Sequence, residues 1–241
     1  MNITKKIEGK LKTINEGETF TYKDLSVEKN EYQSATKAIE RLIKKGIIKR
    51  ISPGIFFKPK QTVFGELLPN EEEILKPYLY KNGNRIAYIT GIYLHNKLGL
   101  TTQIPQIIKI ASREKEIKVN KSNLKVKPAK SYVDVTNKNF QYLEILDTIK
   151  DFKKIPDLDV ENGIKILVNI IKKLKEEDIK RLIKYSLKYP PRTRALLGAL
   201  LEEIGIKDEL KDLIDSLNPL SEYSFGIKKE ILKTAENWKI R

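Results

Sequence analysis

With 241 residues, the chain is long enough for one large domain or for two or three small ones. Its hydrophobic share of 40% is enough to build a core, which argues against global disorder. Its net charge of +15 predicts an anionic partner, namely nucleic acid, an anionic membrane surface or an acidic protein, unless the lysines only reflect genome composition. The absence of cysteine excludes disulfides, thiolate zinc sites and cysteine nucleophiles, and a histidine-based catalytic site would have to rest on His95 alone.

The N-terminal stretch predicts a helix over residues 3–15. Its apolar residues recur at spacings of four, four and three, at Ile3, Ile7, Leu11 and Ile14. The stretch has no apolar h-region and is not a signal peptide. No apolar run in the chain approaches the ~20 residues that span a bilayer. We therefore expect a cytoplasmic protein with no membrane contact.

Short polar signals divide residues 17–30. Gly17 ends the first helix, and Thr19 with Phe20 predicts a short strand. Thr21 and Asp24 have the spacing of a capping box, which predicts a short helix from Tyr22. Asn30 is the expected N-cap of the next helix.

The helix after Asn30 is strongly two-sided. Its apolar residues recur at i, i+3, i+4, i+7 and i+8, at Ala35, Ala38, Ile39, Leu42 and Ile43. At 100° per residue the opposite face carries Ser34, Lys37, Arg41 and Lys44, with Gln33 and Lys45 at its edges. Arg, Lys, Gln and Ser side chains on one exposed face are what reading of the DNA major groove requires. These six residues are the candidate DNA-binding face.

A predicted hairpin follows this helix. Gly46 lets the chain leave the helix, and apolar strands over 47–51 and 55–58 flank the turn Ser52-Pro53-Gly54. Arg50 and Lys58, with Lys49 and Lys60, place charge where a wing meets a phosphate backbone. Residues 1–60 hold 14 Lys and Arg against 7 Asp and Glu. The order of elements predicts a winged helix-turn-helix domain over residues 1–60, used for DNA binding or, alternatively, for protein contact alone.

Residues 61–136 predict a small mixed α/β part. Asn70 is expected to cap a helix that begins with three glutamates, and Thr90 to cap a helix that contains His95. His95 has no second histidine nearby, which favours a structural or surface role. Short strands follow, and four lysines are expected on one sheet face, either solvated or as a second partner surface: Lys109, Lys118, Lys125 and Lys127.

Residues 137–241 predict a mainly helical region, with helices over 137–152, 160–174 and 177–189 and further helices after Pro190-Pro191. Arg192 and Arg194 enter one of these helices at its N-terminus, where positive charge is unfavourable unless an anion or an acidic partner lies there. They are a candidate partner or anion site, against a plain intramolecular salt-bridge role. The single tryptophan, Trp238, is the expected anchor of the C-terminus.

The whole sequence therefore predicts an α+β protein with a domain boundary after residue 60. Phosphate-binding glycine loops, metal-ligand clusters and nucleophile–base sets are missing from the sequence. We expect no enzymatic activity, no cofactor and no metal, with an enzyme acting on nucleic acid as the weakest alternative.

Several phrases of the sequence resemble the AbiEi-type antitoxins of type IV abortive-infection toxin–antitoxin systems. They run in the same order along nearly the whole chain: RISPGIFFKP, NGNRIAYITGIYLHNKLGLTTQIP, YPPRTRALLGALLEEIG, NPLSEYSFGI and TAENWKI. These are structural phrases, not catalytic signatures.

The resemblance implies a winged helix that binds inverted repeats in its own promoter and represses transcription. It also implies a C-terminal domain, here residues 61–241, that counters a nucleotidyltransferase-like toxin. Carried over by position, the DNA-reading surface falls on Ser34, Lys37, Arg41 and Lys44, with Arg50 and Lys58 on the wing. A weak dimer or a cooperative pair on DNA is the expected assembly. The alternative is a winged-helix adaptor that binds an acidic protein and no specific DNA.

Overall fold

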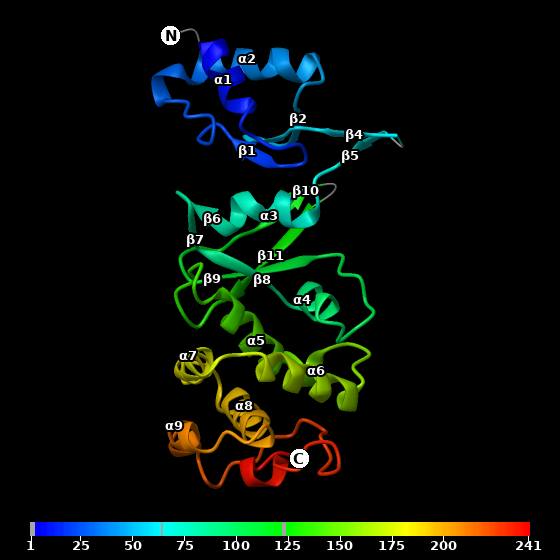
Figure 1. Cartoon of the computed structure of the whole chain (residues 1–241), viewed down its shortest axis with the longest axis vertical. Coiled ribbons are helices and arrows are strands. Elements are labelled where there is room, and N and C mark those ends of the chain that lie inside the picture. The colour runs from blue at the N-terminus through cyan, green and yellow to red at the C-terminus, as the bar shows by residue number, and fades with distance from the viewer. Residues whose placement is uncertain (1–2, 64, 122–123) are drawn as a thin grey trace. The chain divides into compact units, whose positions relative to one another are not determined.

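The computed structural model describes residues 3–63, 65–121 and 124–241 (Figure 1). The chain divides into two compact units, Met1–Gly83 and Asn84–Arg241, which are described separately below. Both units mix helices with small sheets, so the mixed α/β character expected from the sequence is confirmed.

In its described residues, the first unit contains α-helices, a 3-10 turn and several short strands. In chain order these are α1 (Ile3–Leu11), β1 (Thr19–Thr21), a 3-10 turn (Lys29–Glu31), α2 (Tyr32–Lys44), β2 (Lys49–Ser52), β3 (Ile55–Phe57), β4 (Lys60–Thr62), β5 (Gly65–Leu67), α3 (Glu71–Leu79) and β6 (Tyr80–Lys81).

Helix α2 forms where the apolar stripe predicts it. Ala35, Ala38, Ile39 and Leu42 are buried, and they pack with Ile7 and Leu11 of α1 in one core. The helix ends in a left-handed turn at Gly46, whose φ of 72° glycine adopts without strain because it has no Cβ. The amide of Ile47 there donates to the carbonyl of Leu42 at 3.0 Å, the bond of a Schellman motif.

A three-stranded antiparallel sheet of order β1-β3-β2 closes the same core. Phe56 of β3 is the central residue, because it pairs with Phe20 of β1 and with Arg50 of β2. Its fully buried ring lies 5.9 Å from the ring of Phe20 and meets Tyr22 edge-on at 5.3 Å. The core therefore ties the strands to the turn that follows β1.

Two local predictions for this unit are wrong. Residues 22–26 form turns and no helix. The Thr21 amide and hydroxyl do bond the carboxylate of Asp24, at 2.7 and 2.8 Å, but the chain turns away at Ser26, where φ is 56°. Asn30 does not cap α2. It lies inside the 3-10 turn, which is closed instead by the Glu28 amide donating to Glu31 Oε2 at 3.0 Å.

The first unit runs past residue 60, the boundary expected from the sequence. Residues 60–67 form the β4–β5 hairpin, with Phe64 outside the described residues. Asn70 caps α3 as predicted, accepting the Glu73 amide at 2.8 Å. Glu73 in turn accepts the backbone amide and the hydroxyl of Thr19, at 3.1 and 3.3 Å. Because α3 is bonded to β1 in this way, it belongs to the first unit.

The second unit begins with strands and continues with helices. Its elements are β7 (Asn84–Arg85), β8 (Ala87–Thr90), α4 (Ile92–Lys97), β9 (Ile108–Ser112), β10 (Val119–Lys121), β11 (Leu124–Lys130), α5 (Phe140–Asp151), a 3-10 turn (Phe152–Lys154), α6 (Val160–Lys172), α7 (Glu176–Ser186), α8 (Pro191–Glu203), a 3-10 turn (Asp208–Leu210), α9 (Lys211–Asp215) and a last 3-10 turn (Ala235–Trp238).

The sheet of this unit has the order β10-β11-β9-β8, with β9 and β11 parallel and the other pairs antiparallel. Helices α4 and α5 pack against β8, and α6, α7 and α8 extend the same core (Figure 1). The hydrophobic α8 is its most buried helix, since every residue from Ala195 to Leu201 is buried. Trp238 packs on Gly198 of α8 and donates to Glu202 at 2.7 Å, an arrangement that anchors the C-terminal segment.

Within the described ranges, no helix combines the length and the apolar character that crossing a bilayer requires.

Candidate nucleic-acid interface

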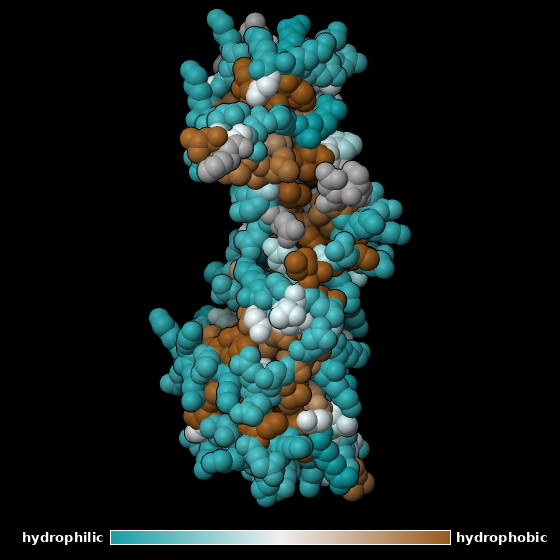
Figure 2. All heavy atoms as spheres, turned by 90° about the vertical axis from the view of Figure 1, so that its right-hand side faces the viewer, coloured by the Kyte–Doolittle hydropathy of each residue, from teal (hydrophilic) through white to brown (hydrophobic). Residues whose placement is uncertain are grey.

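The polar face of α2 lies open to solvent. Its residues are all exposed, namely Gln33, Ser34, Lys37, Arg41, Lys44 and Lys45. They project away from the buried stripe, because helix residues half a turn apart point in opposite directions. Figure 2 shows that long hydrophilic side chains cover much of the visible surface of the first unit.

Among the residues that the structure describes, the cations of this face have no acidic partners. In the described parts of the chain, Lys37, Arg41 and Lys44 make neither a side-chain hydrogen bond nor an ion pair. Helix α7 is different, because its Lys180 pairs with Glu176 at 2.5 Å and its Arg181 with Glu177 at 3.7 Å. Helix α2 carries three cations and one carboxylate, whereas α7 carries three of each. Its surplus charge is therefore available to an external anion.

The residues expected on the wing differ from one another. Arg50 is exposed on β2, and its guanidinium lies 5.5 Å from the ring centre of Phe56, which orients it. Lys49 is exposed but paired with Glu66 of β5. Lys58 is partly buried and donates to the carbonyl of Ile14 at 3.5 Å, so the structure directs it toward its own unit.

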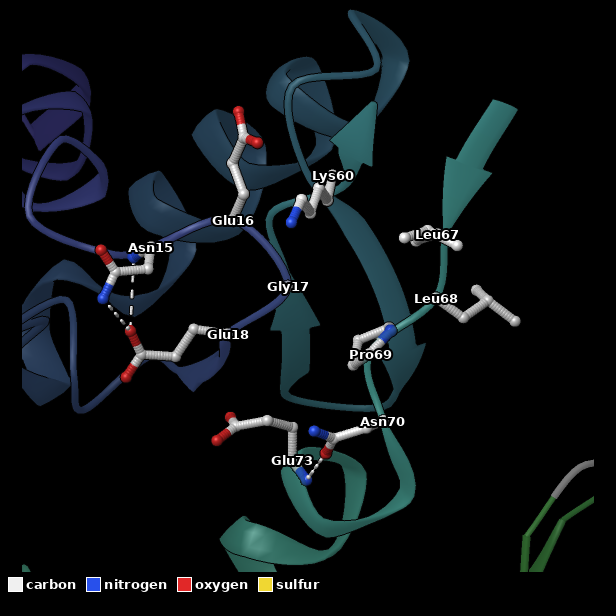
Figure 3. A pocket seen from close by; sticks show the side chains of 10 residues that line it. All are labelled: Asn15, Glu16, Gly17, Glu18, Lys60, Leu67, Leu68, Pro69, Asn70 and Glu73. Atoms are coloured by element: carbon white, nitrogen blue, oxygen red, sulfur yellow. Dashed lines mark hydrogen bonds between the residues drawn. The ribbon is translucent and has the colours of Figure 1, made fainter. Parts of the chain in front are cut away.

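A shallow groove of about 550 Å³ lies beside these strands (Figure 3). It is lined by Asn15 to Glu18, Lys60, Leu67 to Asn70 and Glu73. Two of its carboxylates are already engaged. Glu18 bonds Asn15 and Lys76, and Glu73 bonds Thr19. Lys76 and Asn15 together outweigh burial and lower the pKa of Glu18, which keeps it ionised. These bonds join α3 to the loop before β1, and they give the groove a structural role.

Arg192 and Arg194 lie in the first turn of α8, as expected, with no acidic residue in that turn. Neither forms an ion pair with any part of the chain that the structure describes, so the intramolecular salt-bridge interpretation has no support there. The guanidinium of Arg192 stacks on Phe225 at 4.6 Å.

A buried polar cluster in the second unit was not expected from the sequence. The fully buried carboxylate of Asp147 accepts hydrogen bonds from Tyr88 at 3.0 Å, Thr90 at 2.8 Å and Lys150 at 2.6 Å. Thr90 thus serves this cluster, and the predicted Thr90 cap of α4 is wrong; Gly91 occupies the cap position. One signal was present in the sequence: Asp147 lies four residues after Leu143 on the apolar side of its helix, with Lys150 three residues later.

His95 lies in the same region, on α4, and is 3% exposed. Burial lowers its pKa to about 4, with Lys150 and Lys109 acting in the same direction and Asp147 in the opposite one. The ring is therefore neutral at pH 7. Neither ring nitrogen has a hydrogen-bond partner among the described residues.

The lysines Lys109 and Lys127 stand side by side on paired strands, and Lys125 lies on the same face of β11. The structure thus brings together three of the four lysines expected to share a sheet face. Lys118 precedes β10. In the described ranges, no three His, Cys, Asp or Glu side chains are placed to share a metal ion.

Comparison with known proteins identifies the family to which the chain belongs. A family model described as a family of unknown function (DUF6088) matches residues 6–182. The chain belongs to DUF6088. The DUF6088 match includes the exposed face of α2 and the Asp147 cluster, and it ends before Arg192.

No curated protein matches the DUF6088 chain. Among solved structures, it is similar to the RV2827C protein from Mycobacterium tuberculosis, with a TM-score of 0.50 and 14% identity over 91% of this chain and 83% of that one. At this identity the similarity concerns the fold alone.

Proposed function

We propose that the first unit is a winged helix-turn-helix that binds double-stranded DNA, with α2 as its recognition helix. The order α1, β1, α2 and the β2–β3 hairpin supports this proposal, with the turn at residues 22–26 in place of the short second helix. The observation that carries it is the open face of α2, where Lys37, Arg41 and Lys44 have no acidic partner in the described chain.

The size and chemistry of this face suit the major groove. A helix of 13 residues is about 20 Å long and fits a groove about 12 Å wide. Arg41 and the lysines can bond guanine edges or phosphates, and Gln33 can bond adenine. In this proposal Arg50, whose guanidinium lies over Phe56, bonds a backbone phosphate, a contact that fixes the register of the protein on DNA.

We further propose that the protein represses its own promoter and is the antitoxin of a type IV toxin–antitoxin system. The resemblance to AbiEi-type antitoxins supports this step, and it implies that residues 61–241, which include the second unit, counter a nucleotidyltransferase-like toxin. Two copies would bind the two halves of an inverted repeat, because a symmetric DNA site presents the same pattern of base edges twice.

Binding to the DNA upstream of the gene tests the first proposal. The parent chain should bind with nanomolar affinity, falling steeply as salt rises. In the variant K37A/R41A/K44A the affinity should fall by at least about 100-fold, because each base-reading interaction contributes about 1–3 kcal/mol. The slope of log affinity against log salt should decrease by up to about 2.7, at about 0.9 for each phosphate that the variant no longer neutralises.

A charge-matched control separates this face from general electrostatics. The variant K5A/K10A/K12A removes three exposed lysines of the α1 segment from the same unit and should lose less than about tenfold in affinity. Equal losses in the two variants would refute α2 as the recognition helix. Weak, sequence-indifferent binding by the parent would favour the adaptor alternative.

The antitoxin proposal has a separate test in co-expression. The parent chain should restore growth to cells that express a nucleotidyltransferase-like protein encoded beside it. The variant K37A/R41A/K44A should still restore growth when both genes are driven from foreign promoters, since repression is then bypassed. Failure of the parent chain would overturn the antitoxin role and leave DNA binding untouched.

A further inference from the structure

Four lysines of the second unit meet on one face of the sheet β10-β11-β9-β8 (Figure 1). Lys109 of β9 is the register partner of Lys127 of β11. On the other side of β11, Asn120 pairs with Lys125, so the same antiparallel register places Lys118, the residue before β10, opposite Lys127. Lys118, Lys127 and Lys109 therefore form a row across three strands, and Lys125 lies two residues from Lys127 on the same side. We call these four residues the lysine face.

The lysine face is the outer side of a sheet whose other side is buried. All four lysines are exposed, whereas the alternating residues Ile108, Val119 and Val126 are buried. Successive side chains of a strand point to opposite faces, so these apolar residues anchor the sheet from behind. Lys109 is also packed along its stem, because its side-chain carbons lie 3.0 Å from where a Cβ on Gly91 would be. The lysines are thus held on the outside of a packed sheet.

The charge of this face is not balanced within the described chain. Across the described residues, none of the four lysines makes an ion pair or a side-chain hydrogen bond. Neighbouring strands lie about 4.8 Å apart, and like charges opposite each other on paired strands are destabilising. The three lysines of the row therefore repel one another, and a bound partner with several negative charges relieves this repulsion.

We propose that the lysine face binds an acidic helix of a partner protein. Carboxylates at positions i and i+4 of a helix stand about 5–6 Å apart, close to the spacing of about 4.8 Å along the row. The row is about 10 Å long across its three strands, which matches about two turns of an α-helix. One acidic helix lying across the strands therefore meets all three lysines of the row. This site is independent of the DNA-binding proposal.

The composition of the face favours a protein over nucleic acid. Its strand positions carry lysine and small or uncharged residues, with Asn120 beside Lys125 and the pair Ala111 and Ala129 beyond the row. In the described strands, this face has neither an arginine nor an exposed aromatic ring. Arginine forks bond phosphates at two oxygens and aromatic rings stack on bases, so surfaces that bind nucleic acid use both.

Fluorescence anisotropy with labelled peptides and the full chain tests the face. The probe is an alanine-based helical peptide with a glutamate at every fourth position. The control peptide has the same composition, with its glutamates two residues apart and so on opposite sides of the helix. At constant ionic strength the parent should bind the probe at least about fivefold more tightly than the control peptide, because only the probe presents its carboxylates along one side.

The row variant K109Q/K118Q/K127Q should bind the probe at least about fivefold more weakly than the parent, because each exposed ion pair contributes up to about fivefold. The control variant K154Q/K173Q/K184Q removes three exposed lysines from the helices and turns of the same unit and should bind like the parent. The single variant K127Q should also lose affinity. It protects the test against misfolding, because it changes one exposed side chain.

Equal affinities of the parent, the row variant and K127Q for the probe would overturn the proposal. Equal affinities of the parent for the two peptides, or no binding of the probe to the parent, would also overturn it. A DNA duplex of mixed sequence is the third ligand, and the row and control variants should bind it equally. If the row variant bound the duplex at least tenfold more weakly than the control variant, the face would be a nucleic-acid surface and the proposal would be wrong.

Discussion

The neutral, buried His95 makes a prediction about stability in acid. In the folded chain its pKa is about 4, against 6.5 for an exposed histidine. Between these two values the unfolded chain binds a proton that the folded chain does not. Stability is therefore full above pH 6.5 and is lost as the pH falls toward 4.

The size of the loss follows from the two pKa values. One pKa unit corresponds to 1.36 kcal/mol, so a change from pH 7 to pH 4.5 should remove about 2 kcal/mol through His95. In the variant H95Q this contribution is gone, because glutamine does not titrate. The prediction concerns the pH dependence, so a constant difference between the two proteins at pH 7 does not affect it.

Urea unfolding at pH 7.0, 5.5 and 4.5 measures this contribution. The fluorescence of Trp238, the single tryptophan, reports on the unit that contains His95, since both lie in Asn84–Arg241. The free energy of unfolding of the parent should fall by about 2 kcal/mol more than that of H95Q between pH 7 and pH 4.5. Parallel curves for the two proteins would refute the claim that His95 is held neutral by burial.

Two further substitutions test the packing of the second unit. Gly198→Ala should destabilise it by about 1–3 kcal/mol or more and shift the emission of Trp238, because a Cβ at this position would lie 2.2 Å from the Trp238 ring. The control Gly163→Ala should cost less, because the atom nearest to its Cβ would lie 2.9 Å away. A stable G198A with parental emission would contradict the packing of the C-terminal segment on α8. Asp147→Asn should lower the free energy of unfolding in urea by about 3 kcal/mol, because it leaves the amine of Lys150 without its buried carboxylate partner. The control Asp151→Asn, whose carboxylate lies 3.8 Å from the same amine, should lower it by less than about 1 kcal/mol. Equal losses in the two variants would contradict a special role of Asp147.

The features that the sequence predicts best are those that depend on neighbours along the chain. The apolar stripe of α2, its left-handed exit at Gly46 and the Asn70 cap of α3 all appear as expected. Each rests on residues within about two turns of one another, so the amino-acid pattern carries the information. The exposed face of α2 follows from the same periodicity, since it is the complement of the buried stripe.

Long-range contacts decided the rest. Residues 22–26 remain turns because Tyr22 packs on Phe56, 34 residues away. The hydroxyl of Thr90 donates a hydrogen bond to Asp147, and Thr90 does not cap α4. The amine of Lys58 donates to the carbonyl of Ile14. The carboxylate of Glu73 accepts the amide of Thr19, and this bond makes α3 part of the first unit, beyond residue 60. In each case the group contacts a residue at least 34 positions away, so the pattern of neighbouring residues does not reveal the contact. The sequence predicts which residues face solvent, and the tertiary structure decides which partners the remaining groups take, because those partners lie far away in the sequence.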